Sequence, residues 1–121
     1  MPELLLESLA DIAAALRDGK TTAATLAEEA NANNASRGNP LDAYKTRDPS
    51  QFLAEARVAD AAFGAGLDFG PLQGIPVSVK DLYGVAGYPT FAGTPAALPQ
   101  ELQQHPPVLE MMAQMIIMGL C

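Results

Sequence analysis

The stretch that decides the fold runs from Gly70 to Thr94 and reads GPLQGIPVSVKDLYGVAGYPTFAGT. It opens with turn-forming residues, so it predicts a tight connector. Residues 75–79 predict a β-strand, because apolar β-branched side chains alternate with others, and Lys80 follows directly. From residue 84 to residue 99 the chain is rich in Gly, Pro and Thr and predicts an ordered, irregular loop. One face of the strand carries Ile75, Val77 and Val79, and the other carries Pro76, Ser78 and Lys80.

Three helices are predicted before this stretch. The first is capped by Ser8 and ends at Gly19, and the second starts at Thr21 or Thr22. Residues 31–40 are rich in Asn and Gly and predict the end of that helix and a loop. A third helix begins after Asp48, which is followed by Pro49, and proline is common at the first position of a helix. The predicted buried faces carry Leu9, Ile12, Ala13 and Leu16; Ala23, Leu26, Ala27 and Ala30; and Phe52, Ala56, Ala59 and Phe63.

Two weaker elements complete the pattern. Residues 41–46 could form a short strand, and a last helix is expected from Pro107 to Met118, with a methionine-rich apolar stripe that is interpreted as core. One convincing strand cannot make a sheet, so either strands are missed or their partners lie outside this sequence. We therefore expect one partial, truncated α/β domain. Its residues 1–66 would be helical, and residues 67–121 would hold the lysine-bearing strand, the loop and the last helix.

Composition and charge exclude several classes of protein. Hydrophobic residues make up 49% of the chain and charged residues 17%, which is typical of a globular domain. The net charge of −7, without a basic cluster, disfavours binding to nucleic acid or to an anionic membrane surface. Cys121 is the only cysteine, so an internal disulfide is excluded. The first residues do not resemble a signal peptide, and no apolar run approaches about 18 residues. A cytoplasmic protein is expected.

The segment from Gly70 to Thr94 resembles the amidase signature family. Members of that family carry a Gly-Pro-Leu-x-Gly-Ile/Val-Pro-Val/Ile-x-Val/Ile-Lys-Asp run, commonly followed by Val-Ala-Gly-x-Pro-Thr and Ala-Gly-Ser/Thr. The early helices and residues 42–44 fit the N-terminal part of the family more loosely. The matching residues are Gly70, Pro71, Leu72, Gly74, Ile75, Pro76, Val77, Val79, Lys80 and Asp81, then Val85, Ala86, Gly87, Pro89 and Thr90, and finally Ala92, Gly93 and Thr94.

This resemblance implies the N-terminal part of the amidase signature fold, with helices packed on a mixed sheet. It also implies hydrolysis of small-molecule amides by a Ser–cis-Ser–Lys triad, without a cofactor or a metal. Lys80 matches the catalytic lysine, the base that starts the proton relay. A lysine can act as a base near neutral pH when burial disfavours its charged form, and we expect Lys80 to be buried. Periodicity alone favours a surface lysine at the end of a strand, and only the surrounding motif reverses that preference.

The other polar residues of the motif are interpreted as structural. Asp81 would anchor the lysine loop or cap the next turn, and the Ser78 hydroxyl would be structural. Tyr83 and Tyr88 would line a substrate pocket or pack, and the sequence leaves both open. His105 is interpreted as a loop histidine rather than a metal ligand.

The family's two catalytic serines lie downstream of the lysine, and no serine follows Lys80 in this chain. Its serines are Ser8, Ser36, Ser50 and Ser78. Cys121 is not expected to replace a serine, because a terminal residue lacks a scaffold that would orient it. The chain is therefore expected to be inactive alone.

Two other interpretations stay open. The chain could be a non-catalytic interaction module, in which the loop and the last apolar helix bind a partner. It could also correspond to a piece of one component of a tRNA-dependent amidotransferase, although no basic signal for tRNA binding is present. A homodimer is one assembly that the sequence leaves open.

Overall fold

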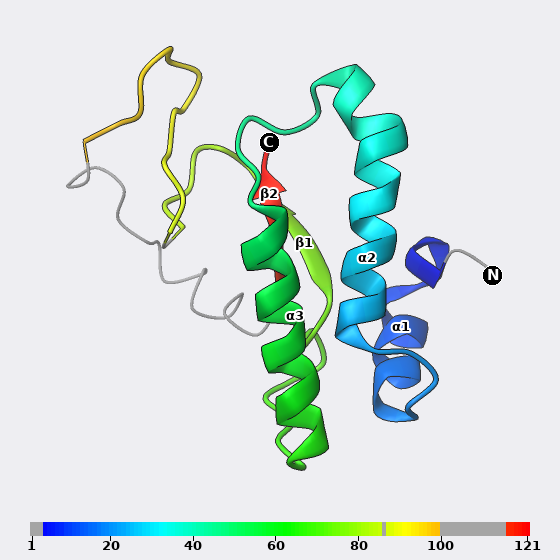
Figure 1. Ribbon diagram of the computed structural model, residues 1–121. Helices are drawn as coiled ribbons and strands as arrows, with labels where there is room; N and C mark the ends of the chain where they lie inside the picture. Colours follow the sequence, from blue (N-terminus) through cyan, green and yellow to red (C-terminus); the bar gives the residue numbers. More distant parts are fainter. Residues whose placement is uncertain (1–3, 86, 100–115) are drawn as a thin grey trace.

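The computed structural model describes residues 4–85, 87–99 and 116–121. Three α-helices dominate it: α1 (Leu9–Arg17), α2 (Ala23–Asn33) and α3 (Pro49–Gly64). Each begins as predicted, because the side chains of Ser8, Thr22 and Asp48 accept the backbone N–H three residues further on. In Figure 1, α2 and α3 run side by side in opposite directions, and α1 lies along the beginning of α2.

Short helical turns surround these helices. A 3-10 turn, η1 (Leu4–Leu6), precedes α1. Residues 31–40 were predicted to hold the end of the helix and a loop. The helix does end there, at Asn33, but the predicted loop is wrong, because the chain continues into a π-helical turn, η2 (Asn34–Gly38), and a 3-10 turn, η3 (Asn39–Leu41). Asn34 is buried there, and its Nδ2 donates to Oδ1 of Asn39 at 2.9 Å. This side-chain bond supports helical turns that Asn and Gly would not favour by propensity.

The helices enclose the main hydrophobic core. The predicted faces of α2 and α3 and most of that of α1 meet there, together with Ile75 from the entrance to the strand. Leu9 was predicted to be buried with them, but at the first residue of α1 it is 58% exposed. Asp60 of α3 ties two of these helices, since its carboxylate accepts the N–H groups of Ala23 and Ala24 at the start of α2. The fully buried members include Phe52 and Leu26, and the core comprises Ile12, Leu16, Ala23, Leu26, Ala27, Ala30, Phe52, Ala56, Ala59 and Ile75.

The described strands form a two-stranded parallel sheet of β1 (Pro76–Val79) and β2 (Ile116–Leu120). β1 confirms the predicted strand. β2 corrects the predicted last helix, because residues 116–118 were assigned to it; the predicted helical residues 107–115 lie outside the described part. Short apolar runs fit a strand as well as a helix, and here pairing with β1 decides.

The predicted strand at residues 41–46 is reduced to a single bridge. Thr46 pairs with Leu120 in antiparallel fashion, and the N–H of Leu120 donates to the Thr46 carbonyl at 2.8 Å. Gly119 permits this approach, since a Cβ there would lie 2.8 Å from the Tyr44 ring and 2.9 Å from the Thr46 carbonyl oxygen. The segment before α3 is thereby fastened to the end of β2.

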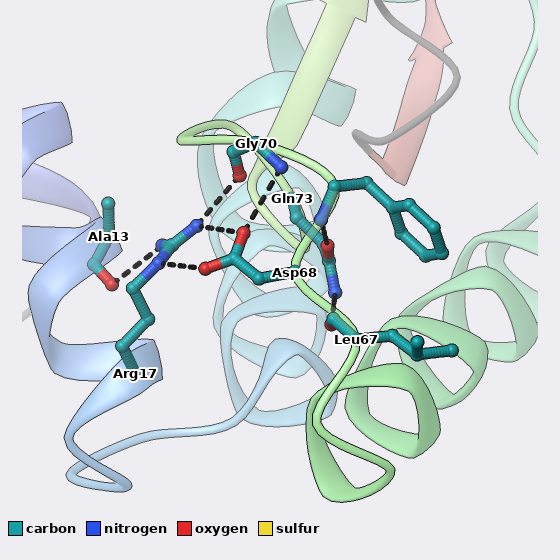
Figure 2. A network of polar contacts seen from close by, with 7 residues as sticks. Ala13, Arg17, Leu67, Asp68, Gly70 and Gln73 are labelled. Atoms are coloured by element: carbon teal, nitrogen blue, oxygen red, sulfur yellow. Dashed lines mark hydrogen bonds and ion pairs between the residues drawn. The ribbon is translucent and has the colours of Figure 1, made fainter.

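A polar network holds the connector that leads into β1 (Figure 2). Arg17, at the end of α1, makes two hydrogen bonds of 2.8 and 2.9 Å to the Asp68 carboxylate. The same guanidinium donates to the carbonyls of Gly70 and Ala13. The Arg17 contact, followed by an N–H bond from Gly70, lowers the pKa of Asp68 below its usual value.

Gln73 stabilises the same connector through hydrogen bonds from its side chain to the backbone. Its side chain is buried, accepts the Phe69 N–H and donates to the Leu67 carbonyl. The turn from residue 70 to residue 74 is therefore tied both to α1 and to itself. This arrangement fixes the direction in which β1 leaves the helical layer.

Candidate active site

Lys80 lies directly after β1, where the strand gives way to a turn. Its carbonyl accepts the N–H groups of Leu82 and Tyr83 at 2.7 and 3.2 Å. The expected burial of Lys80 is wrong for the described chain, because the residue is exposed. The physical reason is its place beyond the last residue of β1, on the strand face opposite the apolar side chains, where the described residues do not cover it.

Asp81 fastens three segments at the end of β1. Its N–H donates to the Cys121 carbonyl at 2.7 Å, and its own carbonyl accepts the Ala92 N–H at 3.0 Å. The residue is only 9% exposed, and Oδ1 accepts the Phe91 N–H at 3.1 Å. The structural role predicted for Asp81 is therefore confirmed: it anchors the lysine turn to the loop and to the segment after β2.

In the described part of the loop after Lys80, internal hydrogen bonds support the ordered, irregular structure that was predicted for residues 84–99. Thr90 is buried and accepts the Leu98 N–H at its carbonyl, while its hydroxyl donates to the Tyr83 carbonyl. Ala92 adopts a left-handed backbone with φ of 51°, and Gly93 follows with φ of 80°. A left-handed alanine costs energy and needs support from its surroundings, which the bond to Asp81 provides.

A cavity of about 440 Å³ opens beside this turn. Lys45 belongs to the segment before α3, 35 residues earlier than Lys80, and also lines this cavity. Its ammonium lies 4.6 Å from the centre of the Phe91 ring. Lys45 was not predicted from the sequence, because only its pairing with β2 brings it close to Lys80. The lining residues are Lys45, Lys80, Asp81, Leu82, Phe91, Ala92, Gly93, Thr94 and Cys121.

The remaining candidates take different places. The Ser78 hydroxyl lies 2.6 Å from the Tyr44 hydroxyl, in keeping with the structural role predicted for it. Tyr83 is exposed, whereas Tyr88 is buried, and burial followed by the charge of Glu55 raises the pKa of Tyr88 to about 12. Tyr88 therefore packs and does not line the cavity.

Cys121 lines the cavity, with its N–H donating to the Val79 carbonyl at 2.9 Å. His105 lies outside the described residues. Across residues 4–85, 87–99 and 116–121, no cluster of His, Cys, Asp or Glu is suited to a metal ion. None of the helices in this part of the chain is long and apolar enough to cross a membrane.

Comparison with known families matches residues 22–115 to the Amidase family. Among curated relatives, the 2-amino-5-chloromuconic acid deaminase of Comamonas testosteroni is 44% identical over 102 residues, which are 84% of this chain and 22% of the relative. A glutamyl-tRNA(Gln) amidotransferase component of Beijerinckia indica is 38% identical over 94 residues, which are 78% of this chain and 19% of that component.

Solved structures agree with the sequence relatives. An amidase crystal structure superposes with a TM-score of 0.81 at 30% identity, covering 93% of this chain and 26% of the other. The native peptide amidase of Stenotrophomonas maltophilia gives a TM-score of 0.80 at 27% identity, covering 96% and 24%. The chain thus spans about a fifth to a quarter of the length of the proteins it matches.

Proposed function

The chain belongs to the amidase signature family, and we propose that it supplies the lysine-bearing part of an amidase active site. The reaction is hydrolysis of a carboxylic acid amide to the acid and ammonia or an amine, through an acyl-serine intermediate. One observation carries the proposal: within the signature segment, Lys80 follows β1 directly and opens onto a cavity. None of the described ion pairs includes Lys80, so no carboxylate of the described residues holds its side chain away from the cavity.

In this mechanism Nζ of Lys80 accepts the proton that leaves the attacking serine through a relay serine, and later returns it toward the leaving amine. Asp81 is a positioning residue, because it fixes the turn that carries Lys80 and touches no reacting atom. Ser78 does not serve as the nucleophile, since its hydroxyl faces Tyr44. Both serines of the mechanism come from polypeptide outside these 121 residues, and that polypeptide covers Lys80.

An exchange enzyme tests the proposal. In it, this chain replaces the matched segment of the Comamonas testosteroni deaminase, and ammonia release is measured on that enzyme's substrate and on simple amides. The exchange enzyme should release ammonia, whereas the 121-residue chain alone should release none. Turnover by the isolated chain, or an exchange enzyme that folds but is inactive on every amide, would contradict the proposal.

A second candidate function is that of the corresponding part of a tRNA-dependent amidotransferase, favoured by the 38% identity to the Beijerinckia indica protein. Exchanging this chain into that protein, in parallel with the deaminase exchange, separates the two functions. Activity restored only in the amidotransferase background would favour the second candidate.

A non-catalytic role would use the apolar surface beside the cavity. Leu82 is 61% exposed and Tyr83 is 44% exposed, next to Lys80. A covering polypeptide, either the rest of an enzyme or a second copy of the chain, would bury them. Size-exclusion chromatography of the chain tests self-association, and a monomer at all concentrations would count against a homodimer.

A further inference from the structure

The cavity beside Lys80 contains a second amine that the proposed reaction does not use. Lys45 comes from the segment before α3, far from Lys80 in sequence, and both side chains line the same space. Proton transfer needs one lysine. The role of the other has to be found in the groups around it.

Lys45 is held on the wall of the cavity by two contacts. Its backbone N–H donates to the Leu120 carbonyl at 2.8 Å, which fixes its Cα against the end of β2. Its ammonium lies over the ring of Phe91, 4.6 Å from the ring centre. Phe91 is in turn held by Asp81, the residue that fixes the turn of Lys80. Asp81 therefore contributes to the placement of both amines, through the turn of Lys80 and through the backbone of Phe91.

The charge of Lys45 lacks an acidic side-chain partner in the described part of the chain. The ion pairs found there join Arg17 to Asp68 and Lys20 to Asp18. Among the described lining residues, Asp81 has the only acidic side chain; it is buried, and its Oδ1 is already bonded to the Phe91 N–H. The lining also includes Cys121, the last residue of the chain, whose terminal carboxylate makes no ion pair with Lys45. A cation over an aromatic face keeps its N–H groups available to an anion, because the ring binds through its quadrupole and accepts no strong hydrogen bond.

We propose that Lys45 binds a carboxylate of the substrate, so that the site takes amides that carry a free carboxylate, such as monoamides of dicarboxylic acids. The inference rests on the proposed function for its substrate, and it deepens that function by naming the substrate class. The net charge of −7 repels anions from the chain as a whole, so the attraction is local and comes from the Lys45 ammonium, which lines the cavity without an ion pair to a described carboxylate. Lys45 is a specificity-determining residue, and Lys80 remains the base.

Binding to the 121-residue chain tests the inference without any turnover. Succinamate, a monoamide with one carboxylate, and succinamide, its neutral diamide counterpart, are each titrated into ¹⁵N-labelled chain, and amide shifts are followed at residues 45 and 91–94. Succinamate should bind about 10-fold or more tightly than succinamide, since a hydrogen bond to a charged group has about that effect. Lys45→Gln should abolish the preference and Lys45→Arg should retain it.

Lys20→Gln is the matched control, because Lys20 is also a surface lysine but lies outside the cavity lining. It should leave the preference unchanged, and the spectrum of each variant reports whether it is folded. Equal affinity for the two ligands, or a preference that survives Lys45→Gln, overturns the inference. A carboxylate preference in the chain together with an inactive exchange enzyme would uphold carboxylate binding and refute only the proposed function.

Discussion

Replacing Asp81 with alanine should destabilise the segment at the end of β1, and it tests whether the Asp81 side chain anchors the loop at Phe91. The residue is 9% exposed, and its Oδ1 accepts the Phe91 N–H at 3.1 Å. Without that acceptor a half-buried backbone donor loses its partner, which costs about 1–2 kcal/mol in the free energy of unfolding. The two backbone bonds of Asp81, to Cys121 and Ala92, do not depend on the side chain and should persist.

Urea denaturation followed by circular dichroism measures the global effect of this substitution. Hydrogen exchange at the Phe91 amide measures the local effect, and it should be faster by about 5- to 30-fold, the factor that corresponds to 1–2 kcal/mol. Asp81→Asn is the control, because the amide oxygen can still accept the Phe91 N–H and the loss should stay below about 0.5 kcal/mol. An alanine variant as stable as the parent, or an asparagine variant that loses as much as alanine, would refute the anchoring role.

Three further substitutions test the framework of the site by urea denaturation. Gly74→Ala should cost about 1–3 kcal/mol, because φ is +77° and the new Cβ would lie 3.3 Å from the Ala23 Cβ; Gly66→Ala, with the same φ and open space around it, should cost less. Asp68→Asn should make the free energy of unfolding depend less on pH in acid. In the parent, the lowered pKa of Asp68 stabilises the folded state at pH values above 3.8, the pKa of the unfolded state, and this contribution disappears as pH falls through the folded-state pKa. The parent protein should lose stability as pH rises from about 10 to about 12, because the raised pKa of Tyr88 favours the folded state only while the phenol is protonated. Tyr88→Phe should remove this pH-dependent loss. Below pH 10 the substitution should cost little, since the buried hydroxyl has no hydrogen-bond partner in the described structure.

Local signals in the sequence predicted the helices and the central strand well. Ser8, Thr22 and Asp48 cap the helices where expected, because capping depends on a few neighbouring residues. The alternation at residues 75–79 identified β1 for the same reason. β2 was missed because an apolar run of five residues has no decisive period, and its pairing partner lies about 40 positions earlier.

The candidate site was predictable only in part. Lys80 and Asp81 were found through the motif, and Asp81 has the structural contacts expected of it. Lys45 was not found, because its approach to the cavity depends on pairing with Leu120, a contact that local sequence does not encode. The described residues leave Lys80 exposed, contrary to the expected burial, since the strand pattern tells which face a residue occupies but not what covers that face.

The central claim is that Lys80 is the base of an amidase site. The most direct measurement is kcat/KM for ammonia release by the exchange enzyme with Lys80 and with Lys80→Met, which keeps the length and the apolar stem of the side chain. Loss of a general base predicts a fall of about 10²- to 10⁴-fold, with Lys20→Met as the unaffected control. A Lys80→Met enzyme that retains activity within about twofold of the parent would contradict the claim.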